Sequence, residues 1–317
     1  MNSLANFCSH LPPAKEPSSR IVKMAQKVKL YKTLWGVPEV AQPVLWGSMF
    51  KQFRQDGFNG IELCGAGPFY PFAGKDDELQ RHLRENDLGL IVQLHTLDYP
   101  VPSANWQKHV DSLRSKVETV VGLKPEIVNC HSGKDSFRLE DSVRFFEEAV
   151  KIEKEFGVVM THETHRQRII HSPFVLRDLA PHLPSELKLN ADLSHFVCVC
   201  ERSLSDELDK DFWPEVLDIV AQRCHLIHAR VGFSQGPQVN DPFAPEHADD
   251  VVAHMGWWKK IAQSMKQRGV VPRVEPEFGP YPYQPHLPYT MQPTADLGEI
   301  NRKFGAKVRN ELDAELA

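Results

Sequence analysis

Short apolar segments recur along the chain, and longer segments with a helical period separate them. Eight of the short segments are rich in apolar and β-branched residues, which predicts β-strands. The predicted strands cover residues 28–34, 58–63, 88–95, 125–131, 157–163, 187–192, 224–230 and 270–277. Successive strands start roughly 30 to 46 residues apart, the size of one strand–helix unit. Eight such units without a break in composition predict a single-domain α/β protein, a closed (β/α)8 TIM barrel, over residues 28–317.

The segment 139–157 illustrates the helical pattern between the predicted strands. Phe146 and Val150 recur at helical spacing on one face, and further apolar residues widen the same stripe. Gly157 follows the last apolar residue, a position typical of a helix C-terminus. Residues 106–123 repeat the pattern, so we expect a helix in both segments.

Two segments are long and rich in residues that favour loops. Residues 232–250 carry Pro and Asp and interrupt the seventh unit, and residues 279–294 are rich in Pro and Tyr. Loops of this length in compact domains are usually functional or disordered. We expect the 232–250 segment to close over the active site and limit the access of water.

The alternation of side chains along the predicted strands indicates which residues face the same way. Counting back from Asp192, the polar residues fall on one side of the strand and apolar residues on the other. In the strands that carry His228 and Glu62, these polar residues likewise lie on one side and apolar residues on the other. Glu163 lies on the opposite side of its strand to His162. In a barrel, the apolar sides pack on helices and the polar ends collect at the carboxyl mouth, where active sites lie.

Composition and charge narrow the classes of function. Hydrophobic residues make up 41% and charged residues 25%, as in an ordinary globular protein with a large core. The formal net charge of −5 offers no basic field for nucleic acid, so no nucleic-acid partner is expected. No apolar run approaches the ~20 residues that span a bilayer, so no membrane partner is expected either.

The N-terminal segment and the cysteines bear on location in the cell. Residues 1–27 are polar, contain Pro and Ser, and lack a hydrophobic signal core, which predicts a flexible lead-in. Their basic residues leave an organelle-targeting peptide as the alternative. The six cysteines form no CxxC pair, which is typical of reduced thiols and predicts a cytoplasmic protein. Cys198 and Cys200 are a minor candidate for metal contact.

The late strands each end in a residue that can bind a hard or borderline metal ion. These residues are Glu163, Asp192, His228 and Glu277. Three carboxylates and an imidazole suit a divalent cation, with Mn²⁺ favoured and Mg²⁺, Co²⁺ or Zn²⁺ as alternatives. Any one of them alone could cap a helix or pair with an arginine. Three acids gathered in one barrel mouth would repel one another without a cation, which favours the metal site.

The eighth strand leaves one ligand open, because it contains two glutamates. Glu275 and Glu277 are two residues apart and therefore point the same way. We prefer Glu277, which lies at the end of the strand, and Glu275 remains the alternative.

Further polar and aromatic residues follow the ends of the strands. Candidates for contact with a substrate are Trp35, Glu62, His95, His131, His165 and Arg166. Trp35 could instead serve only in hydrophobic packing. His95 and His131 could instead contact the metal-binding side chains and hold them in place, without touching the substrate. His165 and Arg166 could instead pair with nearby acids.

Four motifs resemble the xylose isomerase-like TIM-barrel superfamily. They are THETHR (161–166), NADLSHF (190–196), IHARVG (227–232) and PEFGP (276–280). The resemblance runs from Lys29 to Val308 and is strongest to the sugar phosphate isomerase/epimerase members, which are related to ketose 3-epimerases and to inosose and dehydroshikimate dehydratases. It implies that Glu163, Asp192, His228 and Glu277 bind a metal ion. It also implies that His195 and Arg230 contact the substrate.

The chemistry these groups permit is metal-assisted removal of a proton next to a carbonyl, with Glu163 or Glu277 as the base. The sequence therefore predicts an isomerase or epimerase that acts on a sugar, sugar phosphate or polyol through an enediolate. A dehydratase of the inosose or dehydroshikimate type is the nearest alternative. An endonuclease IV-like phosphodiesterase and a non-catalytic sugar-binding barrel are the others. The oligomeric state stays open, with a homo-oligomer compatible with the sequence.

Overall fold

The structure is a computed structural model that describes residues 27–67, 70–97, 100–205 and 207–317. The expected lead-in therefore lies, apart from Lys27, outside the described residues, and so does Cys8. The eight predicted strands all form. They are β1 (Lys29–Thr33), β2 (Gly60–Cys64), β3 (Gly89–His95), β4 (Ile127–His131), β5 (Met160–Glu163), β6 (Lys188–Ala191), β7 (Cys224–His228) and β8 (Arg273–Glu275).

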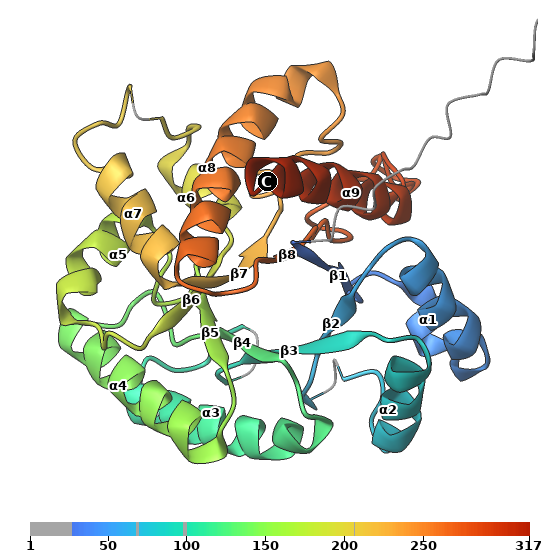
Figure 1. The fold of residues 1–317 in the computed structure, drawn as a ribbon. Helices are drawn as coiled ribbons and strands as arrows, with labels where there is room; N and C mark the ends of the chain where they lie inside the picture. Colours follow the sequence, from blue (N-terminus) through green and yellow to red (C-terminus); the bar gives the residue numbers. More distant parts are fainter. Residues whose placement is uncertain (1–26, 68–69, 98–99, 206) are drawn as a thin grey trace, which may run out of the picture.

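The strands close into a single barrel (Figure 1). Each strand pairs in parallel with the next, and β8 pairs with β1, where Leu30 lies opposite Val274. The (β/α)8 architecture predicted from the spacing of the strands is confirmed. Parallel pairing brings the carboxyl ends of all eight strands to one mouth of the barrel.

Helices surround the barrel in the described part of the chain (Figure 1). The α-helices are α1 (Trp46–Gln55), α2 (Asp76–Glu85), α3 (Trp106–Val120), α4 (Leu139–Phe156), α5 (Pro173–Leu179), α6 (Ser194–Cys200), α7 (Trp213–Arg223), α8 (Ala248–Gln267) and α9 (Leu297–Glu315). Short 3-10 turns are η1 (Pro38–Ala41), η2 (Pro43–Leu45), η4 (Val121–Leu123), η5 (Ala180–His182) and η6 (Pro245–His247). Helices α3 and α4 fall on the two segments with the clearest helical period.

The core has two layers, one inside the barrel and one between the strands and the helices. Tyr31, Ile91, Ile127 and Leu226 form a small buried cluster of their own. Outward residues such as Ile227 belong instead to the large cluster that includes the helices. This division is the one expected from alternation along the strands. Residues at the inward positions near the carboxyl ends therefore project into the mouth.

Local signals in the sequence explain where the helices begin and end. Gly157 ends α4 in the left-handed conformation, with φ of 64°. The Asn105 side chain accepts a hydrogen bond from the backbone N–H of Lys108 and caps α3. Asp296 caps α9 in the same way, through the N–H of Glu299. None of the helices in the described residues is long and apolar enough to cross a membrane.

Candidate active site

Four of the predicted side chains meet at the mouth of the barrel. Glu163 ends β5, Asp192 follows β6, His228 ends β7 and Glu277 lies two residues beyond β8. All four are buried, and one potential ligand atom from each lies within 4.8 Å of the others. The convergence follows from the parallel strands and the shared inward phase of these positions.

The chemistry of these four side chains fits a divalent cation. His228 Nδ1 lies 2.9 Å from Glu277 Oε2, yet neither atom has a hydrogen-bond partner in the described residues. Glu163 Oε1 is also buried without a partner. Buried polar atoms are rarely left unsatisfied, and these three belong to side chains of one group. Three carboxylate oxygens and one imidazole nitrogen are a donor set for a divalent ion of the hard or borderline kind.

The electrostatics of His228 show how strongly the cluster attracts positive charge. Burial lowers the pKa of this imidazole, but the carboxylates of Glu277, Glu62 and Glu163 outweigh burial. The net effect raises the pKa of His228 well above its ordinary value. A cation held between the same groups would meet the same attraction.

Hydrogen bonds to one oxygen hold the Glu163 carboxylate in place. Asn129 and Asn190 donate to Oε2 at 2.8 and 3.2 Å, and His131 Nε2 lies 3.0 Å from it. Burial lowers the pKa of His131 to about 3, so the neutral ring donates a hydrogen bond and forms no ion pair. Sequence reasoning missed both asparagines. Each lies two residues before a mouth residue, His131 or Asp192, and alternation could have identified them.

Arg230 and His195, predicted to contact a substrate, lie beside Asp192. Arg230 Nη2 bonds to the Asp192 carboxylate and lies 2.8 Å from His195 Nε2. Its Nη1 lies 3.4 Å from Glu277 Oε2. Ser194 also donates to Asp192, through both its N–H and its hydroxyl. The guanidinium thus links the carboxylates at two sides of the mouth.

The two glutamates of the last strand lie in different groups. Glu277 belongs to the group with Glu163, Asp192 and His228, whereas Glu275 groups with Glu62 and His228. Glu275 is two residues further from the mouth, and its Oε2 lies 3.9 Å from His228 Nε2. Burial and then the Glu62 carboxylate raise its pKa well above the ordinary value, which favours the neutral acid.

Glu62 contacts the far side of the His228 ring. Its Oε2 lies 3.2 Å from His228 Nε2, while Nδ1 of the same ring faces Glu277. A carboxylate that accepts from one ring nitrogen fixes the tautomer and leaves the other nitrogen for a metal. The geometry therefore places Glu62 behind the ring, where it supports His228.

Histidine rings line one side of the mouth. The ring centroids of His95 and His131 are 4.4 Å apart, those of His131 and His165 are 4.5 Å apart, and those of His165 and His195 are 4.0 Å apart. His131, Glu163 and His165 form another group whose potential ligand atoms lie within 4.8 Å. No such group in the described residues includes a cysteine, so Cys198 and Cys200 are not part of one.

Tyr283, which sequence reasoning did not single out, lies against the mouth. Its ring lies 4.8 Å from the Arg230 guanidinium carbon and 5.2 Å from that of Arg166. Trp35 meets it edge-on, with centroids 5.0 Å apart, and is itself 38% exposed. The Tyr- and Pro-rich composition of residues 279–294 was the available signal, but it could not say which tyrosine faces the site.

The segment 232–250, expected to close over the mouth, is hydrogen-bonded to the loop that carries Tyr283. Gln238 donates to the carbonyl of Gly279 and accepts from its N–H, at 3.0 and 2.8 Å. Gln238 and Val239 are both buried. The Thr294 hydroxyl also donates to the Asn240 side chain, so the two long loops are joined at two points.

A closed parallel barrel with carboxylates, histidines and an arginine converging at its carboxyl mouth defines a TIM-barrel protein with a polar site at that mouth. The family described as xylose isomerase-like TIM barrel matches residues 50–270. The chain belongs to this family. A comparison with curated protein sequences gave no match.

Solved structures share the fold at low sequence identity. A xylose isomerase-like TIM barrel protein from Mycobacterium smegmatis, in complex with magnesium, is 13% identical with a TM-score of 0.60, over 91% of this chain and 98% of that one. A D-tagatose 3-epimerase-like protein is 14% identical with a TM-score of 0.58, over 91% and 100%. A probable 3-DHS dehydratase from Bacillus anthracis is 11% identical with a TM-score of 0.53, over 91% and 99%. At these identities the likeness shows the fold alone.

Proposed function

We propose that the chain is a divalent-metal-dependent isomerase or epimerase that acts on a sugar, a sugar phosphate or a related polyol. The observation that carries the proposal is the buried group of Glu163, Asp192, His228 and Glu277, whose ligand atoms lie within 4.8 Å. These four residues would hold the ion, with Mn²⁺ favoured and Mg²⁺, Co²⁺ or Zn²⁺ as alternatives. Membership of the family and the likeness to an epimerase-like protein support it.

The bound ion would act as a Lewis acid that polarises the carbonyl and hydroxyl oxygens of the substrate. The chain's own residues would move the proton. Glu163 is fixed through Oε2 and keeps Oε1 without a hydrogen bond, so Oε1 is the atom we assign to accept a proton from carbon. Glu277 follows β8, three strands around the barrel from β5, so we assign it to return a proton to the other face of the carbon. That arrangement favours epimerisation over a shift of the carbonyl.

The residues around the four ligands would bind and orient the substrate. Arg230 and His195 present donors beside Asp192, where they would fix substrate oxygens. Tyr283 and Trp35 offer aromatic faces at the rim, which suit the apolar side of a sugar ring. We propose that the substrate is also contacted by His95, His131, His165 and Arg166. Glu62 is better explained as support for His228.

The proposal is tested by loading the purified protein with Mn²⁺ and incubating it with a panel of ketoses, aldoses and their phosphates. We expect one substrate to give its epimer or isomer, and Glu163→Gln to abolish the product while the fold is kept. Turnover of none of the panel, with metal bound at full occupancy, would favour the sugar-binding barrel. Loss of water from an inosose or from dehydroshikimate would instead make the chain a dehydratase.

One observation supports a second candidate, a phosphodiesterase like endonuclease IV. His131, Glu163 and His165 form an additional group that shares Glu163 with the first, so two ions could lie side by side. The net charge of −5 does not favour DNA as a substrate. Nicking of an abasic DNA duplex by the metal-loaded protein, without any sugar turnover, would establish this function in place of the first.

A further inference from the structure

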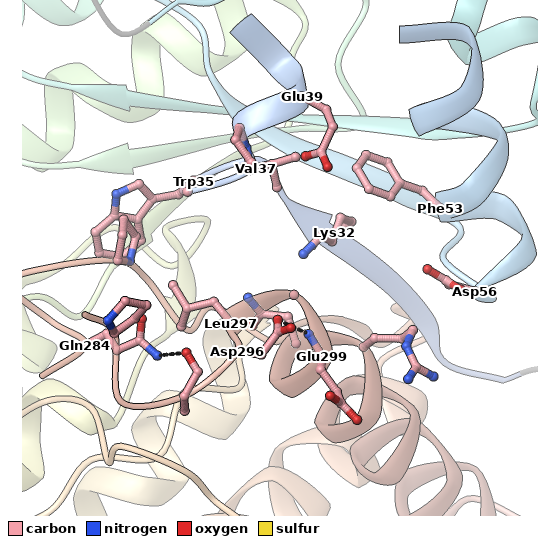
Figure 2. A pocket seen from close by; sticks show the side chains of 18 of the residues that line it. Lys32, Trp35, Val37, Glu39, Phe53, Asp56, Gln284, Asp296, Leu297 and Glu299 are labelled. Atoms are coloured by element: carbon pink, nitrogen blue, oxygen red, sulfur yellow. Dashed lines mark hydrogen bonds between the residues drawn. The ribbon is translucent and has the colours of Figure 1, made fainter. Parts of the chain in front are cut away.

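A large cavity lies outside the barrel, over the outer side of β1 and between α1 and α9 (Figure 2). Its volume is about 1280 Å³. Small-molecule sites usually occupy about 300–1,000 Å³, so the cavity is large enough for a ligand. Much of its wall is apolar. The apolar lining includes Trp35, Val37, Met49, Phe53, Phe58 and Leu297.

A lysine lines this apolar cavity. The outward positions of the first strand and its flanks are Val28, Leu30, Lys32 and Leu34, and all four are buried. Three are aliphatic and pack against the helices, as outward positions in a barrel should. Lys32 occupies the remaining position and is only 6% exposed. Burial of an ammonium group without a partner is costly, so this position calls for an explanation.

The Lys32 ammonium has no polar partner within the part of the chain that the structure describes. No hydrogen bond or ion pair reaches Nζ, and its nearest aromatic contact is the Phe58 ring, 6.0 Å away. That distance is the outer limit for a cation–π contact. Figure 2 shows the nitrogen pointing into the open space between Val37 and Leu297. The cavity therefore holds a buried positive charge that is free to bind an anion.

Four acidic residues lie at longer range from Lys32. They are Glu39 in η1, Asp56 after α1, Glu275 in β8 and Asp296 at the start of α9. Burial lowers the pKa of Lys32 to about 8 and outweighs the opposing effect of the acidic residues. None of them forms an ion pair with it. Glu39, Asp296 and Glu299 are exposed at the rim, and so is one cation, Arg302. Acids therefore outnumber cations at the rim, whereas Lys32 is the buried positive charge inside.

We propose that this cavity binds a small amphipathic molecule with one carboxylate group on an apolar body. The carboxylate would pair with Lys32, and the apolar body would lie on the aromatic and aliphatic walls. The acidic rim disfavours a second negative charge and favours an ammonium or hydroxyl group at the outer end. The cavity reaches the rim of the barrel mouth at Trp35, which lines both. Lys32 lies on the outer side of β1 and is not one of the candidate ligands, so a test at Lys32 does not depend on the enzymatic function.

Octanoate is the probe, and titration calorimetry gives its affinity. We expect a Kd of about 1 mM, in the range of small fragments, and about three- to fourfold weaker binding for each methylene removed. Lys32→Met keeps the aliphatic stem and removes the charge, and should weaken binding at least tenfold. Lys51→Met on the exposed face of α1 is the matched control and should bind as the parent does. Equal binding to Lys32→Met, or none to the parent, overturns the proposal.

The charge pattern is tested with three analogues of the same length. Octanol lacks the carboxylate and should not bind, octanedioate should bind more weakly than octanoate, and 8-aminooctanoate should bind at least as tightly. Octanol that binds as tightly as octanoate would show an apolar groove without an anion site. Octanedioate that binds more tightly would contradict the role assigned to the acidic rim.

Two further measurements separate binding from folding. Because Lys32 is unpaired, Lys32→Met should unfold at the same temperature as the parent or higher. A marked fall would mean that the ammonium is paired within the fold, contrary to the proposal. A bound carboxylate stabilises the charged amine, so octanoate binding at pH 8.5 should take up protons in the parent and not in Lys32→Met. Binding without proton uptake would place the carboxylate elsewhere.

Discussion

At the scale of single residues, the choice between Glu275 and Glu277 shows what the sequence could and could not decide. Alternation states only that both side chains point inward. The two glutamates differ in their position along the barrel axis. That position depends on the register between β8 and β7, in which Glu275 lies opposite His228. Glu277 lies further along, level with the mouth, and joins the candidate ligands. Burial, and then the Glu62 carboxylate, raise the pKa of Glu275 and favour its neutral form.

This difference predicts unequal effects of two matched substitutions. Glu277→Gln should weaken the binding of Mn²⁺ by about 100-fold or more and reduce turnover by orders of magnitude, because a charged ligand is lost. Glu275→Gln replaces an acid whose neutral form it closely resembles, so the effect should stay below about tenfold. Metal affinity measured by calorimetry on both variants checks this. A severe loss in Glu275→Gln with a mild one in Glu277→Gln would reverse our assignment.

At the scale of elements, the hydrophobic pattern predicted all eight strands and the two best-defined helices. It succeeded because outward strand positions and helical stripes must be apolar to build the layer between them. It did not place Tyr283, because the path of residues 279–294 depends on tertiary contacts such as those of Gly279 with Gln238. The candidate ligands were predictable because they lie at strand ends, whereas the loop residues beside them were not.

The end of α4 provides a prediction on stability. Gly157 has a φ of 64°, and a Cβ added there would meet no atom within 4 Å, so Gly157→Ala should destabilise the protein by about 1 kcal/mol through backbone strain alone. Gly256 is the control, since it is exposed within α8 and also has open space around it. Gly256→Ala should stabilise by up to about 1 kcal/mol. Urea unfolding measures both, and a shift of equal sign would contradict the account.

At the scale of the whole molecule, a network of ion pairs connects β1 and β8, the two strands whose pairing closes the barrel, to the residue before β4. Glu126, just before β4, accepts from the Tyr31 hydroxyl at 2.8 Å and pairs with Lys29 and Arg273, each at 3.2 Å. Burial alone would raise the pKa of Glu126, but the Tyr31 hydrogen bond and the two cations outweigh it and lower that pKa. The ionised carboxylate therefore links three strands across the barrel.

The lowered pKa of Glu126 predicts how its contribution varies with pH. A carboxyl group with a depressed folded-state pKa stabilises the fold above its unfolded pKa, and the contribution is lost as pH falls through the folded value. Glu126→Gln should therefore cost about 1–2 kcal/mol at pH 7. The difference from the parent should shrink below about pH 4.5. Urea unfolding at several pH values tests this, and a difference that grows in acid would contradict it.

The central claim, proton transfer to and from carbon at the barrel mouth, is tested most directly by deuterium exchange. Metal-loaded protein is incubated in D₂O with ketoses, inososes and dehydroshikimate, and the substrates are followed by NMR. We predict that deuterium enters one C–H position next to the carbonyl of at least one substrate, and that Glu163→Gln abolishes the exchange. Fully metal-loaded protein that exchanges no C–H position of any substrate would contradict the account.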